Sequence, residues 1–570
     1  MRQLRSTVWR GSWRTTIAAP IQGDTYGVAA QALQRQRKVW GWGYEGDGLE
    51  RDETLALGEL LAARFGLDDL EIAEPPSVAQ LRLPEPRLKP PGSLTEICAT
   101  DPLDRATHTY GKSFRDLVRS LRGDYSSAPD FVAHPHSERD VVRLLDWCAE
   151  SQVAAIPYGG GSSVVGGVEP AVGSGYRGAV SIDLGWLDRV LEIDHASRSG
   201  RIQAGVLGPA LEQQIRPHGL TLRHYPQSFE VSSLGGWIAT RSGGHYATLH
   251  THIDEFVQGL RAVTPAGVLE TRRLPASGAG PSPERLLCGS EGILGIITEA
   301  WMRLQDRPRF RASAVARFVD FEHGVAATRE LAQSGLHPSN CRLLDHSEAL
   351  VSGSGDGTTT LLIVAFESAD HELQAWIRPA IEICRRHGGD VPEPQVRAGT
   401  DDSGERAGAA GTWRSSFLRG PHLHDALVRL GMISETFETA ITWDKFERFH
   451  ASVMKAAQDA VDAACGQGMI SCRFTHVYAD GPAPYYTVVA PGRAGAELEQ
   501  WDAIKTAASE AILSHGGTIT HHHAVGRYHR PWYDRERPEL FAQALRAAKA
   551  ALDPRGILNP GVLLDPALIK

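Results

Sequence analysis

A glycine-rich loop that directly follows a buried strand sets the strongest limit on the fold of this chain. An apolar run ends at Pro157, and residues 157–167 then read PYGGGSSVVGG. Glycines let a backbone approach a bound phosphate closely and point several amides at it, while Ser162 and Ser163 add hydroxyl donors. A flexible connector is the alternative interpretation, but the preceding strand and the Val-Val pair favour a phosphate site. The loop is neither a dinucleotide-fold G-x-G-x-x-G nor a P-loop, because no Gly-Lys-Ser/Thr follows.

Length and composition indicate a folded protein of two or three domains. The chain has 570 residues, of which 42% are hydrophobic and 22% charged, and both values are typical of folded proteins. Its net charge of -9 argues against a nucleic-acid partner, which needs a basic surface. A small anion held by one or two local arginines is still compatible with this charge. No stretch approaches the roughly 18 consecutive apolar residues of a membrane span.

The cysteines and the start of the chain predict a cytoplasmic location. The chain has seven cysteines and no C-x-x-C pair, which indicates reduced, mostly buried thiols rather than disulfides or a zinc site. Residues 1–16 are basic and Trp-rich, with no apolar signal core behind them. Peripheral contact with a membrane surface stays compatible with these features.

The pattern of apolar runs divides the chain into four segments. Residues 1–124 are expected to form an N-terminal arm with a helical segment, and residues 125–306 an α+β domain. Residues 307–515 are expected to form a second domain, in which an antiparallel sheet carries helices on one face. Residues 516–570 form a C-terminal segment.

Short apolar runs and helical spacing locate the individual elements. Strands are predicted at 131–133, 153–157, 179–182, 190–193, 201–204, 314–319, 361–366, 471–477 and 485–489. Helices are predicted at 53–65, after Ser137, and at 321–333, 371–387, 443–464 and 497–514. The proline-rich stretch 74–93 is expected to run extended, and the small polar residues 396–411 to form a mobile surface loop.

Two further segments join the glycine loop in a recognisable order. Residues 226–244 read PQSFEVSSLGGWIATRSGG, and residues 289–298 read GSEGILGIIT. Each alone is typical of a tight turn with small residues. Together the three segments resemble the FAD-binding domain of the vanillyl-alcohol oxidase and p-cresol methylhydroxylase (PCMH) superfamily. The resemblance implies a PCMH-type FAD-binding domain of two subdomains at 125–306.

The resemblance also implies which residues hold the cofactor. They are Pro157, Tyr158, Gly159, Gly160, Gly161, Ser162 and Ser163 in the first segment, Gln227, Ser228, Phe229, Glu230, Val231, Ser232, Ser233, Thr240, Arg241, Ser242 and Gly243 in the second, and Glu291, Gly292, Ile293, Leu294, Gly295, Ile296 and Ile297 in the third. Covalent attachment in this superfamily often uses a histidine inside the phosphate loop, and this loop has none. We therefore expect non-covalent FAD, although residues 241–245 (RSGGH) superficially resemble a covalent-flavin signature.

Nearly the whole chain from Trp40 resembles the alkyldihydroxyacetonephosphate synthase family, most weakly in residues 350–412. The motifs that carry this resemblance are WGWGY at 40–44, TYGKSFRD at 109–116, RGD at 122–124, PDFV at 129–132, RLLD at 342–345, ETFET at 435–439 and HHH at 521–523. The resemblance implies an enzyme that exchanges the acyl chain of an acyl-dihydroxyacetone phosphate for a fatty alcohol through a flavin N5 adduct, in ether lipid synthesis. It also implies a small, lipid-like substrate and a homodimer.

The family resemblance assigns roles to several residues. Tyr485 matches the tyrosine that moves a proton, His521, His522 and His523 match a triplet needed for activity, Arg342 matches an important arginine, and His224 matches a histidine before the second flavin segment. Three adjacent histidines on an extended segment cannot share one face, so at most two of them can point into the site. No metal is predicted, because a metal site favours ligands two to four residues apart plus a carboxylate. Without the resemblance, the preferred interpretation of Tyr485 is an aromatic residue in the core of a strand.

Two departures from the family pattern bear on the substrate. Residues 422–425 read HLHD where the family has Y-L-R-D, so His424, a candidate catalytic residue, replaces a substrate-contacting arginine. Residues 524–527 read AVGR where the family usually has Gly-Val-Gly. The alternative function is an FAD-dependent dehydrogenase or oxidase that takes hydride from a 2-hydroxy acid or another alcohol. A non-catalytic flavoprotein is a third option, against which the number of titrating residues counts.

Overall fold

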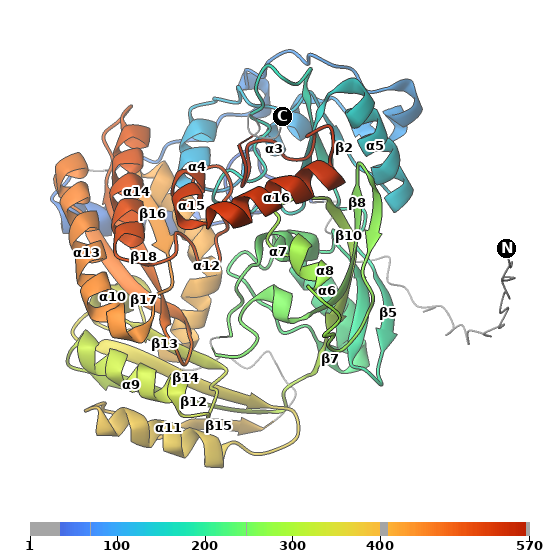
Figure 1. The fold of residues 1–570 in the computed structure, drawn as a ribbon. Helices are drawn as coiled ribbons and strands as arrows, with labels where there is room; N and C mark the ends of the chain where they lie inside the picture. Colours follow the sequence, from blue (N-terminus) through green and yellow to red (C-terminus); the bar gives the residue numbers. More distant parts are fainter. Residues whose placement is uncertain (1–34, 69, 247, 399–408, 566–570) are drawn as a thin grey trace, which may run out of the picture.

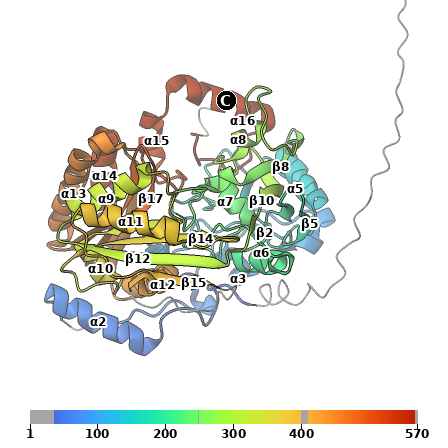
Figure 2. The ribbon, with the colours of Figure 1, turned by 90° about the horizontal axis from the view of Figure 1, so that it is seen from below.

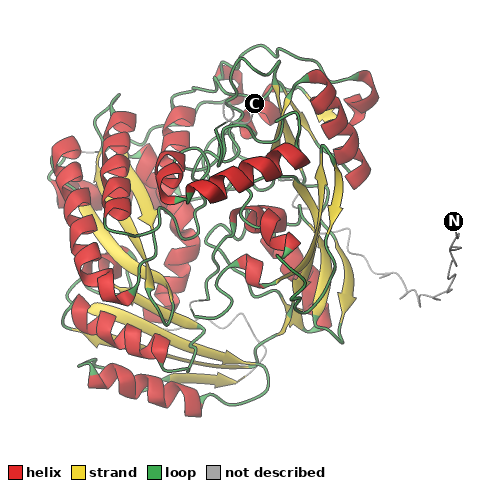
Figure 3. Ribbon diagram, in the orientation of Figure 1, coloured by secondary structure: helices red, strands yellow, loops and turns green. Residues whose placement is uncertain are grey.

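A computed structural model describes residues 35–68, 70–246, 248–398 and 409–565, and these form two lobes that lie side by side (Figure 1). The first lobe contains the strands between residues 98 and 306, and the second contains a large sheet between residues 310 and 491. Figure 2 shows the molecule from below, with α2 (Arg51–Phe65) lying against the second lobe. Figure 3 shows that both lobes mix helices and strands.

The first lobe begins with a four-stranded sheet that ends at the glycine loop. Its order is β1-β2-β4-β3, with β4 parallel to β2 and to β3 and with β1 antiparallel to β2. The strands are β1 (Cys98–Ala99), β2 (Phe131–Ala133), β3 (Ala154–Tyr158) and β4 (Ala179–Asp183). Helix α5 (Glu138–Ser151) joins β2 to β3, and the Ser137 side chain caps it by accepting the Asp140 N–H, as the sequence predicts.

A five-stranded antiparallel sheet completes this lobe. Its order is β5-β6-β10-β8-β9, and its strands are β5 (Val190–Asp194), β6 (Ser199–Gln203), β8 (Val257–Thr264), β9 (Gly267–Glu270) and β10 (Ile296–Arg303). Strand β10 follows the third glycine-containing segment directly. The packing of this sheet therefore fixes where that segment lies.

The second lobe is built on a seven-stranded antiparallel sheet in the order β15-β12-β14-β13-β17-β18-β16. The strands are β12 (Phe310–Phe318), β13 (Asn340–Leu344), β14 (Thr360–Ser368), β15 (Gln395–Ala398), β16 (Met432–Glu438), β17 (Met469–Val477) and β18 (Pro482–Pro491). Helices pack on one face, as predicted. They are α9 (Phe321–Gln333), α11 (Gln374–Arg386), α13 (Trp443–Cys465) and α14 (Glu497–Ser514).

The other face of this sheet is partly covered by α10 (His346–Val351) and by α12 (Ala409–Arg429), a helix that the sequence did not predict. Side chains on a strand alternate between faces. On β18, Tyr486 and Val488 therefore pack under the helices, while Tyr485 and Thr487 face the other way and line a cavity. The period-two pattern thus places Tyr485 on the open face of the sheet.

Several segments reach from one lobe to the other. The N-terminal arm does so near α12, where Trp42 donates its backbone N–H to Asp425. Helices α15 (Arg530–Glu536) and α16 (Glu539–Leu552) follow α14 and run back to the first lobe (Figure 1). The chain then pairs beside β3, where Ala155 and Leu558 form a bridge. The C-terminal segment therefore returns to the glycine loop.

The remaining elements are short. They are α3 (Pro102–Thr107), α4 (Phe114–Leu121), α6 (Gly208–Ile215), α7 (Leu234–Thr240), α8 (Pro283–Leu287), β7 (Leu220–Thr221), β11 (Gln305–Asp306) and four 3-10 turns, Val78–Gln80, Gly92–Ile97, Arg216–His218 and Ile253–Glu255. The proline-rich stretch 74–93 contains one of these turns and no α-helix.

Three other sequence predictions meet the structure here. The loop predicted at 396–411 falls mostly on residues 399–408, outside the described residues, while its first residues belong to β15 and its last to α12. All seven cysteines are free thiols, and five of them are buried. Among the described helices, none has the length and apolar character needed to cross a membrane.

Candidate active site

A cavity of about 360 Å³ lies between the three glycine-containing segments and the open face of the large sheet. It is lined by all seven predicted residues of the first segment and by most of those predicted in the second and third. The six predicted cofactor residues that do not line it are Phe229, Glu230, Val231, Arg241, Ile293 and Leu294. Val231 instead contacts the glycine loop from behind and borders a small neighbouring pocket.

The glycine loop presents free amides to this cavity. Within the described part of the chain, the backbone N–H groups of Gly160, Gly161, Ser162 and Ser163 donate no hydrogen bond to protein. The loop also packs too tightly for side chains, since a Cβ on Gly160 would lie 1.7 Å from the Val231 carbonyl oxygen. Free amides on a close-packed loop suit the pyrophosphate of FAD. These residues therefore fit the cofactor that the sequence implies.

Glu291 of the third segment ties the cofactor wall to the chain after the histidine triplet. Its carboxylate accepts the backbone N–H groups of Val525 and Gly526 at 2.9 and 2.8 Å. Burial raises the pKa of Glu291 to about 7, although these two hydrogen bonds lower it. The residues AVGR that depart from the family pattern are thus held by a predicted cofactor residue.

The substrate side of the cavity carries more positive than negative charge. Arg473 on β17 donates to Glu348 at 2.6 Å, and its guanidinium carbon lies 3.8 Å from the centre of the Tyr485 ring. Arg342 on β13 is 1% exposed and has no carboxylate partner within the described residues. One carboxylate therefore faces two guanidinium groups, which leaves a net positive charge beside the cavity.

Arg342 is held by backbone and rings rather than by an acid. Its Nη2 donates to the His245 carbonyl at 3.0 Å, and its guanidinium lies over the Phe417 ring. Its Nε and Nη1 find no acceptor within the described structure. The pKa of Arg342 is lowered to about 9, first by burial of the guanidinium and second by the positive charge of Arg473. A buried donor without a partner is costly, so this guanidinium is a site for an anionic ligand.

His424, which replaces the family arginine, lies on α12 and lines the same cavity. Its Nε2 is buried without a hydrogen-bond partner in the described residues. Burial lowers the pKa of His424 to about 4, so the ring is neutral near pH 7. Arg473 and Lys505 also line the cavity but pair with Glu348 and Glu435, so within the described residues the lining cation without an acidic partner is Arg342, and His424 offers a neutral imidazole.

One carboxylate holds the backbone of the histidine triplet in place. Glu438, at the end of β16, accepts the backbone N–H groups of His521, His522 and His523 at 2.7, 3.1 and 2.9 Å. It also accepts the Thr520 hydroxyl. Burial raises the pKa of Glu438, but the neighbouring histidines lower it well below its ordinary range. The carboxylate therefore stays ionised and fixes the direction of all three side chains.

The three histidines point to different places. His522 and His523 line the cavity, and both rings lie near Tyr485, with ring centres 6.1 and 5.3 Å away. His521 does not line the cavity; it faces His252 and Tyr478 instead. Burial lowers the pKa of His523 to about 3.

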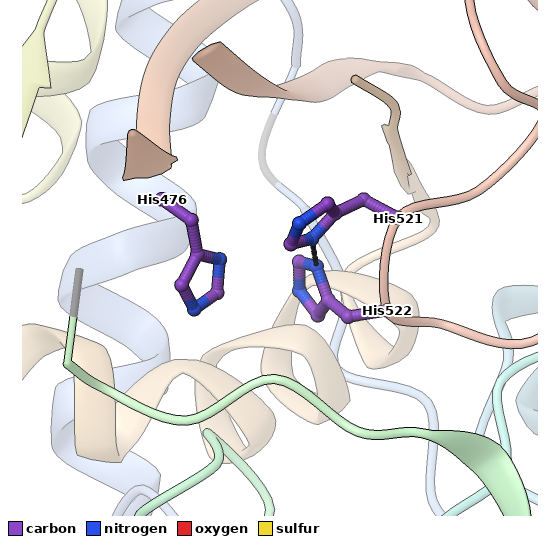
Figure 4. Close-up of side chains that lie close together, drawn as sticks. All are labelled: His476, His521 and His522. Atoms are coloured by element: carbon purple, nitrogen blue, oxygen red, sulfur yellow. Dashed lines mark hydrogen bonds between the residues drawn. The ribbon is translucent and has the colours of Figure 1, made fainter. Parts of the chain in front are cut away.

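A cluster of imidazoles lies beside the cavity (Figure 4). His476, His521 and His522 place one ring nitrogen each within 4.8 Å of one another. A β-bulge between Phe474 and His476 aims His476 at the cluster. That spacing suits a shared metal ion, yet both nitrogens of His521 already make hydrogen bonds. An ion would have to break them, so the geometry favours a hydrogen-bonded cluster.

His224 lies behind the second segment rather than at the cavity. Its Nε2 is 2.9 Å from the Ser242 hydroxyl, and its ring packs against Trp237 and Phe256. Burial lowers the pKa of His224 to about 3, which keeps the ring neutral. In this position His224 supports the backbone of residues 242–244 and does not border the cavity.

Comparison with known proteins identifies the family. A profile described as "FAD binding domain" matches residues 129–272, and one described as "FAD linked oxidases, C-terminal domain" matches residues 307–563. Alkyldihydroxyacetonephosphate synthase of Dictyostelium discoideum is 32% identical over 485 residues, which cover 81% of this chain and 78% of that protein. The chain belongs to the alkyldihydroxyacetonephosphate synthase family. Its members use FAD, and this chain is an FAD-dependent enzyme of that family.

Solved structures agree with this assignment. A structure of alkyldihydroxyacetonephosphate synthase matches with a TM-score of 0.75 at 25% identity, covering 92% of this chain and 98% of that one. p-Cresol methylhydroxylase, at 14% identity, shares the fold with a TM-score of 0.62 over 82% of this chain and 94% of that one. These matches confirm the predicted α+β fold with a PCMH-type FAD-binding domain and an antiparallel-sheet domain.

The sequence did not single out several residues of this synthase-family site. Arg473, His476 and His252 entered no prediction, and Glu438 entered only as part of the ETFET motif, without a role. A usable signal existed for Arg473 alone, because an arginine between apolar residues in a predicted strand (SCRFT, 471–475) must find a partner when buried. Glu438 contacts a residue 83 positions away, and His252 contacts one 269 positions away, so no local sequence pattern predicts these contacts.

Proposed function

We propose that this chain exchanges the acyl chain of an acyl-dihydroxyacetone phosphate for a fatty alcohol, which yields an ether lipid precursor. The single observation that carries the proposal is Arg342, a buried guanidinium beside the cavity that has no acidic partner among the residues the structure describes. A phosphate monoester would supply the missing acceptors and the missing negative charge. A neutral alcohol substrate would not supply the negative charge and would leave the Arg342 guanidinium uncompensated.

Apolar residues support a lipid-like second substrate. Apolar side chains from α10, α12 and β18 line the same cavity as Arg342; they are Val351, Trp413, Phe417, Pro421, Leu423, Leu427 and Val489. Burying an alkyl chain against such a wall is favourable by about 0.8 kcal/mol per CH₂ group. The cavity thus offers a cation for a charged head and apolar side chains for a hydrocarbon tail.

Tyr485 and the two cavity-facing histidines are proposed to handle protons. Burial raises the pKa of Tyr485 more than the neighbouring Arg473 lowers it, so the phenol keeps its proton in the free protein but lies beside a cation that would stabilise its deprotonated form. His522 and His523 place their rings next to the same phenol. A phenol and a neutral imidazole in contact can pass a proton to and from a substrate carbon. Bound FAD supplies the nucleophilic ring nitrogen that this exchange requires.

The decisive experiment is product analysis with the FAD-loaded protein. Incubation with palmitoyl-dihydroxyacetone phosphate and labelled hexadecanol should yield labelled ether and free palmitate, and Tyr485→Phe should lower the rate by roughly 100-fold. The alternative dehydrogenase function predicts no ether. It predicts instead that D-2-hydroxy acids bleach the flavin under anaerobic conditions.

We also propose a homodimer and a cytoplasmic location for this enzyme. Both rest on the family resemblance and on the composition of the chain. Light scattering of the purified protein tests the first, since a mass near 62 kDa would indicate a monomer. Fractionation of the source cells tests the second.

A further inference from the structure

The inference that follows rests on the proposed function, because the proposed exchange releases a proton inside the cavity. The acyl chain leaves as a carboxylate, because a carboxyl group with an ordinary pKa near 4 to 5 is ionised at pH 7. The alcohol, in contrast, brings a hydroxyl proton that the ether product does not keep. One proton per turnover must therefore leave a site whose walls are mostly buried.

The hydrogen bonds of His252 fix its tautomer. Its Nδ1 lies 2.8 Å from the Arg241 carbonyl oxygen, and a carbonyl can only accept. In the neutral ring, therefore, Nδ1 carries the proton and Nε2 carries none. The Nε2 of His252 lies 3.1 Å from the Nε2 of His521. Because the His252 nitrogen carries no proton, His521 must be the donor of this hydrogen bond.

The same logic continues inwards to the cavity. A neutral His521 with its proton on Nε2 has a bare Nδ1, which lies 3.0 Å from the Nδ1 of His522. His522 must therefore donate from Nδ1, and the Glu438 carboxylate, 3.2 Å from the same nitrogen, demands the same. The Nε2 of His522 is left bare on a ring that lines the cavity.

We infer that His522, His521 and His252 form a proton relay that carries the released proton from the cavity to the surface. A proton binds Nε2 of His522, and the Nδ1 proton of that ring passes to Nδ1 of His521. The Nε2 proton of His521 then passes to Nε2 of His252, whose Nδ1 proton leaves to water. Each ring gains one proton and loses one, so the charge is conserved at every step.

The surroundings of the relay suit this role at both ends. At the inner end, Glu438 stabilises the imidazolium that forms when His522 takes up a proton. At the outer end, Arg241 is exposed, and its hydrogen bond with His252 lies at the solvent boundary. The other groups facing the rings are His476, the Tyr478 hydroxyl at 2.7 Å from His521, and Asp254 near His252. Rotation of the three rings restores the starting tautomers, so that the net movement of the proton is outwards.

Replacing His252 tests the relay. His252→Gln keeps a donor to the Arg241 carbonyl and an acceptor for His521 but cannot pass a proton onward. We expect kcat to fall roughly 10-fold or more with unchanged KM and unchanged flavin absorbance. In His252→Ala, imidazole added to the buffer should restore kcat in a concentration-dependent way. A merely structural role would not respond to buffer, and exposed His250→Gln serves as the matched control that keeps wild-type kcat.

A second measurement does not depend on turnover. Neutron diffraction from deuterium-exchanged crystals of the FAD-loaded protein should show deuterium on Nδ1 of His252, Nε2 of His521 and Nδ1 of His522. Deuterium on Nε2 of His252, a stoichiometric metal ion on His521, wild-type kcat in His252→Gln, or failure of imidazole rescue would each overturn the relay. Absence of ether product from the wild-type protein, with these tautomers in place, would refute the proposed function alone.

Discussion

At the scale of single residues, Arg342 combines a stability cost with a binding role. It lies almost fully buried, two of its nitrogens find no acceptor in the described part of the chain, and Arg473 adds a like charge nearby. Burying an unpaired charge opposes folding, whereas an anionic ligand would reverse the penalty. The fold keeps this arginine in the position where a phosphate group would compensate it.

Arg342→Met should therefore separate the two effects. We expect the free energy of unfolding of the variant, without substrate, to rise by about 1 to 3 kcal/mol, because an apolar side chain of similar length removes the uncompensated cation. Synthase activity should fall by at least roughly 100-fold. Urea denaturation and the ether assay measure the two quantities. A variant that is less stable than wild type would show that the guanidinium is satisfied in the free protein.

At the scale of elements, the active site depends on backbone segments held at close range. The glycine loop touches the second segment so closely that Gly160 has no room for a methyl group. Helix α12 approaches the same segment through Gly420, where a Cβ would lie 2.0 Å from the Gln227 amide nitrogen. Small residues at these contacts set the width of the cavity.

Gly160→Ala should abolish FAD binding. The added methyl group must push the loop away from the Val231 carbonyl, and the amides then lose their common direction. We expect the purified variant to hold less than about a tenth of the wild-type FAD. Gly173→Ala is the matched control, because a Cβ there meets nothing within 4 Å. Full FAD occupancy in Gly160→Ala, read from the absorbance ratio, would contradict the pyrophosphate assignment.

Glu438 controls a second element, the turn that carries the histidine triplet. Glu438→Gln removes the charge that three backbone N–H groups share, which should destabilise the protein by about 2 to 3 kcal/mol. Hydrogen exchange of the amides of residues 521–523 should quicken, and activity should fall while FAD stays bound. If those amides exchange at the wild-type rate, another group holds the turn.

At the scale of the whole molecule, the segments that would hold the cofactor belong to one lobe, and residues of the other lobe line the rest of the same cavity. No histidine or cysteine lies in residues 157–167 to form a covalent bond with the cofactor. Acid precipitation should therefore leave the yellow colour in the supernatant. Added FAD should also raise the melting temperature of the apoprotein, because ligand binding to the folded state alone shifts unfolding by mass action. Colour in the pellet would indicate a covalent link.

Much of this fold could be read from local patterns, and the rest depends on distant contacts. Strand β3, helix α5 and the glycine loop follow from apolar spacing, a serine cap and flexible residues, all within 30 positions of one another. Helix α12 escaped prediction because Gly420 and Pro421 lie inside it and oppose a helix in isolation. The directions of the histidine side chains could not be predicted either. Those of the triplet depend on Glu438, and that of His476 depends on a bulge in β17.

The return of the C-terminus to the glycine loop has a consequence for biosynthesis. Asn559 donates its backbone N–H to Ala155 and its side chain to the Gly167 and Glu291 carbonyls, bridging about 400 positions of sequence. A ribosome must therefore release the last residues before the pyrophosphate cradle can close. Both lobes can begin to fold during translation, but we expect the nascent chain to stay colourless until Asn559 has emerged, and a nonsense mutation shortly before Asn559 to yield an apoprotein.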